Sequence, residues 1–417
     1  MFYDRTILDN GIVVISESIP TVRSVALGIW VAAGSRDERP EEAGVSHFLE
    51  HMMFKGTAAR SAQDISEAFD RLGAEVNAFT SEEATCYYSR VIDRHAAEAF
   101  GVLADMVVDS AFDEGAAASE REVVLEEISR AEDAPDQKVD DLFSRTLWPD
   151  HPVGRPVLGE RETVGALTPA HLRSYTGRHY RAGDIVVAAA GNLTHDDVAT
   201  LAASALAGLP AGERAARELG PAIAARHVAV ATKDTEQAHI CWGTLSLDAM
   251  SPDRFAMDLL SAVLGGSMAS RLFQEIREKR GLAYAVHSYN AMYTDTGGFT
   301  VYAGTRPENT ARVVELITVE IGKVLDSGIT AAELDRARES VDGHIVLGLE
   351  NTNRRMMLLG GSEVGGRELL SIDEVIERYG AVTLDDIHRV AVSTLGGPRT
   401  LAVVGPHAAD EIEALLA

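Results

Sequence analysis

Residues 44–54 read GVSHFLEHMMF, and this segment is the most informative stretch of the 417-residue chain. Its apolar side chains recur with helical spacing, and we expect a helix over residues 43–55. Two residues that are four apart in a helix lie about 40° apart on one face, at 3.6 residues per turn. His47 and His51 therefore share a face, and Glu50 lies between them.

This HxxEH pattern has the chemistry of a metal site. Two imidazoles one turn apart can bind one Zn²⁺ at about 2.0–2.1 Å, and a carboxylate beside them can take a proton from water. HxxEH is the inverted form of the HExxH motif of zinc peptidases. The alternative is an amphipathic helix whose histidines make ordinary hydrogen bonds. Because burying two imidazoles and a carboxylate is costly unless something binds them, the apolar surroundings favour a metal.

A catalytic zinc has three protein ligands and one open position, so a third ligand is expected from another element. The predicted helix over residues 114–131 contains four glutamates within a short stretch, Glu120, Glu122, Glu126 and Glu127. Glu120 and Glu127 are two turns apart and share a face. That spacing suits one metal ligand and one carboxylate that supports an imidazole, whereas Glu122 and Glu126 fit a solvated acidic face. Spacing alone does not show which of the four glutamates is the third ligand.

The chain repeats an order of elements. A strand followed by two long helices appears over residues 87–130 and again over 299–347. Between these regions, residues 209–221 (LPAGERAARELGP) are polar and bracketed by prolines, which is typical of a linker. We predict an α+β fold of two homologous domains, residues 1–208 and 222–417, each with an antiparallel sheet and helices on one face. The other helices predicted from periodicity include 62–72, stopped by Gly73, and 270–279.

Composition excludes several classes of protein. The chain has 64 acidic and 38 basic residues, a formal charge of −26, which repels nucleic acid and anionic lipid and attracts cationic ligands. No apolar run approaches the roughly 20 residues that span a bilayer, and residues 1–18 lack the features of a signal peptide. The two cysteines, Cys86 and Cys241, are expected to be buried thiols rather than a disulfide. We therefore expect a cytoplasmic protein that binds neither nucleic acid nor membrane.

Three segments of the first half resemble the active-site half of the pitrilysin family of zinc peptidases: GVSHFLEHMMFKGT at 44–57, NAFTSEEATCYY at 77–88 and EREVVLEEI at 120–128. The resemblance implies one Zn²⁺ held by His47, His51 and Glu127. It also implies that Glu120 supports the site and that Glu50 is the general base.

The resemblance extends to the predicted strand at residues 77–80, which corresponds to an edge strand that binds extended substrates by strand addition. Backbone recognition of this kind favours unfolded peptides of varied sequence. The substrate-binding residues so implied are Asn77, Ala78, Phe79 and Thr80.

The second half resembles the same family through residues 265–286, GGSMASRLFQEIREKRGLAYAV. This match implies that Arg277 and Tyr284 reach the scissile peptide. A guanidinium and a phenol can donate hydrogen bonds to the oxyanion that develops in amide hydrolysis. The second half has no HxxEH, so one zinc per chain is expected.

The chain length is similar to that of the processing-peptidase branch of the family, in which two such chains close as a clamshell. The resemblance therefore implies that this chain forms half of a clamshell, as a homodimer whose active sites are shared between chains. Two alternatives stay open, a non-catalytic structural or substrate-recognition subunit of the same fold and a zinc hydrolase with a non-peptide substrate. The presence of all the motif residues favours a zinc endopeptidase that cleaves unfolded peptides.

Overall fold

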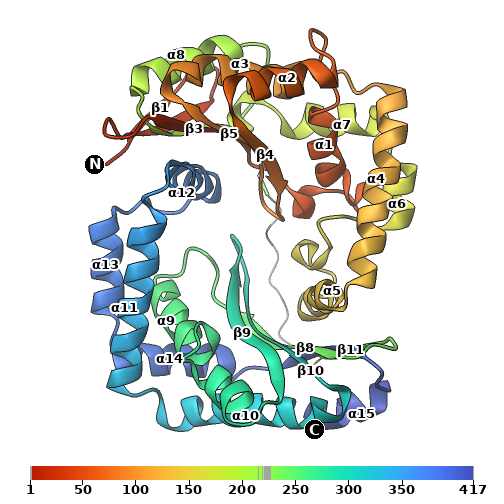
Figure 1. Ribbon diagram of the computed structural model, residues 1–417, viewed down its shortest axis with the longest axis vertical. Coiled ribbons are helices and arrows are strands. Elements are labelled where there is room, and N and C mark those ends of the chain that lie inside the picture. Colours follow the sequence, from red (N-terminus) through yellow and green to blue (C-terminus); the bar gives the residue numbers. More distant parts are fainter. Residues whose placement is uncertain (1, 215, 218, 220–226, 417) are drawn as a thin grey trace. The chain divides into compact units, whose positions relative to one another are not determined.

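The chain forms two compact units in a computed structural model that describes residues 2–214, 216–217, 219 and 227–416 (Figure 1). Unit 1 contains Met1–Ile128, Pro156–Glu218 and Leu347–Ser371, and unit 2 contains Ser129–Arg155, Leu219–Val346 and Ile372–Ala417. The predicted domains were continuous in sequence, whereas each compact unit includes a segment from the other half. The predicted linker at 209–221 includes residues 215, 218, 220 and 221, which lie outside the described residues.

Unit 1 contains a six-stranded sheet with the order β1-β2-β6-β3-β5-β4. Its strands are β1 (Asp4–Ile7), β2 (Val13–Ser18), β3 (Ser24–Val31), β4 (Glu75–Thr80), β5 (Thr85–Ile92) and β6 (Ile185–Gly191). Strands β2 and β6 are parallel, and the other pairs are antiparallel. The expectation of a purely antiparallel sheet was therefore wrong at this pair. Three further strands and several helices separate β2 from β6 in the sequence, and a connection of this length permits parallel pairing.

Helices cover both faces of this sheet. Alternate side chains of β3 point to opposite faces. Val25, Leu27 and Ile29 join the main core with the local helices, whereas Ala26 and Trp30 pack against α12, which comes from the second half of the chain. We predicted helices on one face of the sheet. That prediction holds for the helices that are close to the strands in sequence, but it does not include α12, which covers the opposite face. The helices of unit 1 are α1 (Val45–Met53), α2 (Ala62–Leu72), α3 (Ala96–Val108), α4 (Glu114–Asp133, which continues into unit 2), α6 (Arg161–Ala166), α7 (Pro169–His179), α8 (His195–Ala205) and α12 (Thr352–Gly365).

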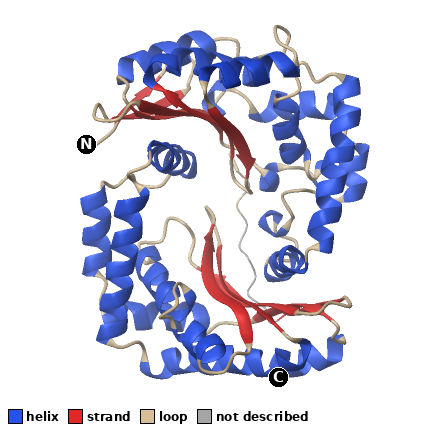
Figure 2. Cartoon of the chain, in the orientation of Figure 1, coloured by secondary structure: helices blue, strands red, loops and turns tan. Residues whose placement is uncertain are grey.

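Unit 2 contains a five-stranded sheet with the order β7-β11-β8-β10-β9. Figure 2 draws the strands of both sheets in red and the helices in blue. Its strands are β7 (His227–Thr232), β8 (Ala238–Ser246), β9 (Ala283–Met292), β10 (Gly297–Thr305) and β11 (Thr400–Gly405), and β7 and β11 are parallel. Val139 and Phe143 of α5 pack on this sheet against Cys241 and Tyr302. The helices of unit 2 are α5 (Pro135–Leu147), α9 (Arg254–Gly265), α10 (Thr310–Ser327), α11 (Ala331–Gly348), α13 (Ile372–Ala381), α14 (Leu384–Leu395) and α15 (Ala409–Glu413).

Local sequence signals fix several of these elements. Helix α2 has the predicted bounds, because the Ser61 hydroxyl caps its first turn and Gly73 ends it with φ +61°. The helix predicted over 270–279 is π-helical over Phe273–Glu278. Cys86 and Cys241 are free and buried, as predicted. Within the described part of the chain, no helix is both long and apolar enough to cross a lipid bilayer.

Candidate metal centre

Helix α1 carries the HxxEH motif, and its start is fixed by a glycine and a buried carboxylate. Gly44 precedes the helix with φ +91°, where a side chain would be strained and would meet Val164 and the Leu158 carbonyl. The Glu38 carboxylate accepts hydrogen bonds from the N–H groups of Gly44 and Ser46, at 2.7 and 2.8 Å. A carboxylate at this position satisfies free N–H groups and complements the positive end of the helix dipole.

His47, His51 and Glu127 come together beside this helix. Each contributes one possible ligand atom, and the three atoms lie within 4.8 Å of one another. Oε2 of Glu127, on α4, is 3.7 Å from Nε2 of His47 and 3.5 Å from Nε2 of His51. Two ligand atoms on a tetrahedral zinc, each about 2.1 Å from the metal, lie about 3.4 Å apart. The observed spacing fits a single zinc ion, and no other such group of ligands occurs among the described residues.

The environment of His47 also fits a metal ligand. Its Nδ1 is buried and has no hydrogen-bond partner within the described structure. Burial and the neighbouring His51 lower the pKa of His47 to about 4, so the imidazole is neutral at pH 7. Neutral imidazole is the form that coordinates a metal. Nε2, which faces Glu127, is therefore available as a ligand atom.

His51 is oriented by a second carboxylate. Its Nδ1 lies 2.8 Å from Oε1 of Glu120, and Lys55 donates to the other oxygen of Glu120 at 2.6 Å. Burial acts to raise the pKa of Glu120, but the hydrogen bonds from Lys55 and His51 outweigh it and hold the pKa below its ordinary value. A carboxylate on the far nitrogen fixes the tautomer and orientation of a metal-binding imidazole. Lys55 was not among the predicted site residues, although its position four residues after His51 places it near the same face.

Glu50 lies between the two histidines and contacts the edge strand. Its Oε2 accepts a hydrogen bond from the Thr80 hydroxyl at 2.7 Å. Burial raises the pKa of Glu50, while the Thr80 hydrogen bond and His51 oppose that shift and Glu127 adds to it. A half-buried carboxylate beside two imidazoles has the surroundings that a general base requires. Both residues were predicted site residues, but their contact was not foreseen.

The predicted substrate strand is an edge strand. Strand β4 is the last strand of the sheet, and β5 is its sole hydrogen-bonded neighbour in the described structure. It contains all four predicted residues, Asn77, Ala78, Phe79 and Thr80. The Asn77 side chain accepts a hydrogen bond from the Ala78 N–H at 2.9 Å. The strand thus offers an edge for pairing, and its role in substrate binding stays a prediction.

Arg277 and Tyr284 lie next to each other in unit 2. Arg277 is part of the π-helical segment Phe273–Glu278 and donates to the Tyr284 carbonyl at 2.8 Å. Its guanidinium carbon is 4.8 Å from the ring centroids of both Tyr284 and Phe273. Tyr284 is 78% exposed, so its side chain is accessible to solvent. The structure brings these two residues together, and their action on a peptide stays a prediction.

Comparisons with known proteins match both halves of the chain to one family. Residues 13–161 match the family model "Insulinase (Peptidase family M16)", and residues 166–341 match "Peptidase M16 inactive domain". The first match contains all three candidate ligands and Glu50. The second contains Arg277 and Tyr284, in the half that lacks an HxxEH motif.

Relatives and solved structures agree with these matches. The chain is 43% identical over 411 residues to an "uncharacterized zinc protease" of Streptomyces coelicolor, with 96% of this chain and 89% of that protein covered. It is 40% identical over 410 residues to one of Bacillus subtilis, with 96% and 98% covered.

Two crystal structures share the fold at 23% identity. One is a peptidase M16 inactive domain from Pseudomonas fluorescens, with a TM-score of 0.92 and 98% and 99% of the chains covered. The other is a protease from Helicobacter pylori, with a TM-score of 0.89 and 96% and 99% covered. With relatives near 40% identity along almost its whole length, the chain belongs to the pitrilysin, or M16, family of metallopeptidases, as its motifs predicted.

Proposed function

We propose that the chain is a zinc-dependent endopeptidase that cleaves unfolded peptides, with one Zn²⁺ per chain. The observation that carries the proposal is the group His47, His51 and Glu127, whose ligand atoms have the spacing of one tetrahedral ion, with Glu50 between the two histidines. Family membership and the "zinc protease" names of the relatives support it.

In the proposed mechanism, His47, His51 and Glu127 hold the metal. A bound zinc ion supplies Lewis acidity, which lowers the pKa of water and polarises a carbonyl. Glu50 takes the proton of the attacking water and then donates it to the nitrogen of the leaving amine. The Thr80 hydroxyl donates to Oε2 of Glu50, so we assign the proton to Oε1. Glu120 keeps His51 in the tautomer that leaves Nε2 free for the metal.

The edge strand supports an extended peptide as substrate. A peptide can add to the free edge of β4 through backbone hydrogen bonds. Such bonds recognise the extended backbone of the peptide more than its side chains. The negative charge of the chain favours peptides that carry basic residues.

Digestion of a mixed peptide library by the zinc-loaded protein, read by mass spectrometry, tests the activity. Glu50→Gln should abolish hydrolysis and retain zinc, because it removes the base and leaves all ligands in place. His51→Ala should lose both. Near-normal turnover in zinc-loaded Glu50→Gln would show that Glu50 is not the base. A zinc-loaded wild-type chain that cleaves no peptide would favour the alternative of a non-catalytic subunit of this fold.

We further propose that the active protein is a homodimer in which Arg277 and Tyr284 of one chain stabilise the oxyanion at the zinc of its partner. With no second sequence in view, the simplest closed assembly is a pair with two-fold symmetry and two equivalent sites. The exposed, stacked arrangement of Arg277 and Tyr284 is compatible with contact to a substrate held elsewhere.

Complementation tests the shared site. Glu50→Gln and Tyr284→Phe chains, each inactive alone, are mixed and allowed to exchange. One of the two sites in each mixed dimer then holds both Glu50 and Tyr284, and random exchange should restore about a quarter of wild-type activity. If both variants are inactive alone and the mixture stays inactive after exchange has been shown by differently tagged chains, the site is completed within one chain.

A further inference from the structure

Thr80 occupies a position where the edge strand and the candidate base meet. It is the last residue of β4, and its hydroxyl donates to Oε2 of Glu50 at 2.7 Å. The contact joins two elements that are 30 residues apart in sequence. Within the described structure, this is the one side-chain hydrogen bond that Glu50 makes. The orientation of the Glu50 carboxylate therefore depends on where Thr80 lies.

The hairpin that follows β4 fixes the position of Thr80. Thr80 is the strand partner of Thr85, and the turn between them is closed by the Ser81 N–H, which donates to the Ala84 carbonyl at 2.8 Å. The Thr85 hydroxyl donates to the Ala33 carbonyl at 3.0 Å. The strand pairing and the turn bond fix the end of β4 against β5, so the Thr80 hydroxyl has a defined place.

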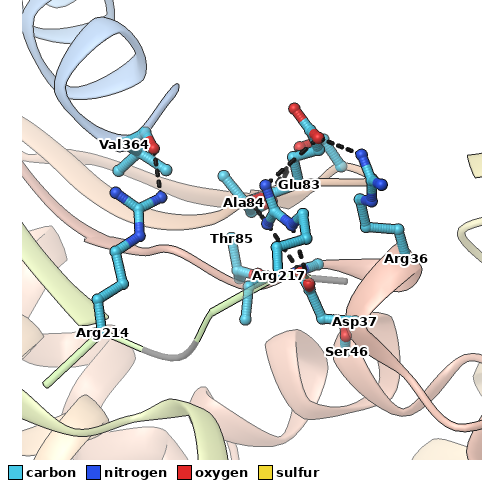
Figure 3. A network of polar contacts seen from close by, with 12 residues as sticks. Arg36, Asp37, Ser46, Glu83, Ala84, Thr85, Arg214, Arg217 and Val364 are labelled. Carbon is cyan, nitrogen blue, oxygen red and sulfur yellow. Dashed lines mark hydrogen bonds and ion pairs between the residues drawn. The ribbon is translucent and has the colours of Figure 1, made fainter. Parts of the chain in front are cut away.

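Two arginines contact residues of the same turn (Figure 3). Arg36, whose side chain is 1% exposed, contacts the Glu83 carboxylate at 2.5 Å. Arg217 donates to the Glu83 carbonyl at 2.8 Å and binds the Asp37 carboxylate through two nitrogens, at 2.9 and 2.8 Å. Paired arginine–carboxylate bonds of this kind restrict geometry strongly. The turn that follows Thr80 is thus held by contacts from both arginines.

We propose that Thr80 is a positioning residue for Glu50, an inference that rests on the proposed function because it takes Glu50 as the base. A glutamate side chain turns about three bonds, and a hydrogen bond to one carboxylate oxygen selects among its rotamers. The Thr80 hydroxyl holds Oε2 and leaves Oε1 directed to the attacking water. The backbone of Thr80 belongs to the strand edge, so its hydroxyl and its backbone have separable roles.

Substitutions at Thr80 separate these roles. Thr80→Val removes the hydroxyl with little change of shape and leaves the strand backbone intact, while Thr80→Ser keeps a hydroxyl. Thr80→Ala provides a second hydroxyl-free variant in case the valine side chain does not fit. The matched control is Thr85→Val, which removes a hydroxyl from the strand partner at a site that does not contact Glu50.

The measurements are kcat and KM on a peptide identified in the library digestion, with zinc content and melting temperature for each variant. Thr80→Val should lower kcat about 10- to 100-fold, the usual effect of losing a partner that orients a reactive group, and should change KM by less than about twofold. Zinc content should be unchanged. Thr80→Ser should recover most of kcat. Thr85→Val should lower the melting temperature and leave kcat near the wild-type value.

Three results would overturn the inference. Wild-type kcat in Thr80→Val, with Glu50→Gln inactive, would show that Glu50 needs no support from the hydroxyl. A rise in KM alone would assign the Thr80 side chain to substrate binding. An equal loss of kcat in Thr85→Val would assign the effect to hairpin packing. A zinc-loaded wild-type chain without activity gives a different outcome, because it refutes the proposed function and this inference falls with it.

Discussion

The glutamates of α4 allow a graded test of the metal centre. Glu127 lies against both histidines. Of the two histidines, Glu120 contacts His51 alone, at the nitrogen far from Glu127, and Glu126 is exposed on the same helix. Glu127→Gln replaces the carboxylate of a candidate ligand with a neutral amide, whose oxygen binds metals weakly. Glu120→Gln keeps an acceptor for the His51 N–H but removes the charge that Lys55 and His51 share. Glu126→Gln changes net charge by the same amount as the other two and is the matched control.

The structure sets the expected magnitudes. The Glu120 side chain is 9% exposed, so water does not replace its contacts readily. Loss of such a supporting carboxylate weakens metal binding about 10- to 100-fold, or about 1.4–2.8 kcal/mol. Loss of one of three ligands should exceed about 100-fold, because the metal loses a bond rather than support for one. Glu126→Gln should change zinc affinity less than about twofold, since an exposed charge near the site is screened by solvent and salt.

Competition with a chelator of known affinity measures these differences, and atomic absorption after dialysis provides a second readout. The loss of zinc affinity should be largest for Glu127→Gln, smaller for Glu120→Gln and smallest for Glu126→Gln. An equal loss at Glu126 and Glu127 would mean that the register of α4 against α1 is wrong by one residue. Unchanged affinity in Glu120→Gln would show that its hydrogen bond to His51 contributes nothing to metal binding.

Three further predictions concern stability. Gly360→Ala places a methyl group against the Trp30 indole, where α12 packs on the sheet, and should lower the free energy of unfolding by about 1–3 kcal/mol. The control is Gly343→Ala, in open space on α11, which should leave the free energy of unfolding unchanged or raise it by up to about 1 kcal/mol. Hydrogen bonds from Arg271 lower the pKa of Glu333 to about 2, so the pair stabilises the fold above about pH 4.5 and ceases to do so as the pH falls through 2. Glu333→Gln should therefore cost about 1–2 kcal/mol at pH 7, and denaturant titrations should show the difference from wild type vanish near pH 2. Removing zinc with a chelator should lower the melting temperature and adding zinc back should restore it, whereas an unchanged transition would argue against a metal bound to the folded state.

Features encoded over short distances could be predicted from the sequence. Helix α2 has a serine cap and a terminal glycine, and its bounds were correct. The spacing within HxxEH fixes the relative positions of His47, Glu50 and His51 on one helix, whatever the rest of the fold. Strand β1 was not foreseen, because all four of its residues are exposed and it has no apolar alternation.

Features that depend on distant partners could not be predicted. Nothing in residues 352–365 indicates that this helix packs against Trp30, more than 300 positions earlier, instead of the neighbouring elements of its own half. The same holds for α5, whose apolar side chains pack on β8, β10 and β11, the first of which begins about 90 residues after α5 ends. Hydrophobic periodicity predicts that a face is buried and does not identify the surface that buries it. The contact between Thr80 and Glu50 could not be predicted for the same reason, because it joins two elements whose packing the sequence pattern does not give.

The candidate third ligand, Glu127, lies between these two cases. At 100° per residue, Glu127 points within about 20° of Glu120, whereas Glu126 points about 120° away. The buried residues of α4, which are Ala117, Glu120, Val124 and Ile128, confirm that Glu120 lies on the packed side. Helix geometry therefore excludes Glu126 once one glutamate is placed, but it cannot say that α4 packs against α1 at all. That packing is tertiary, and only the resemblance to a known family could supply it before the structure did.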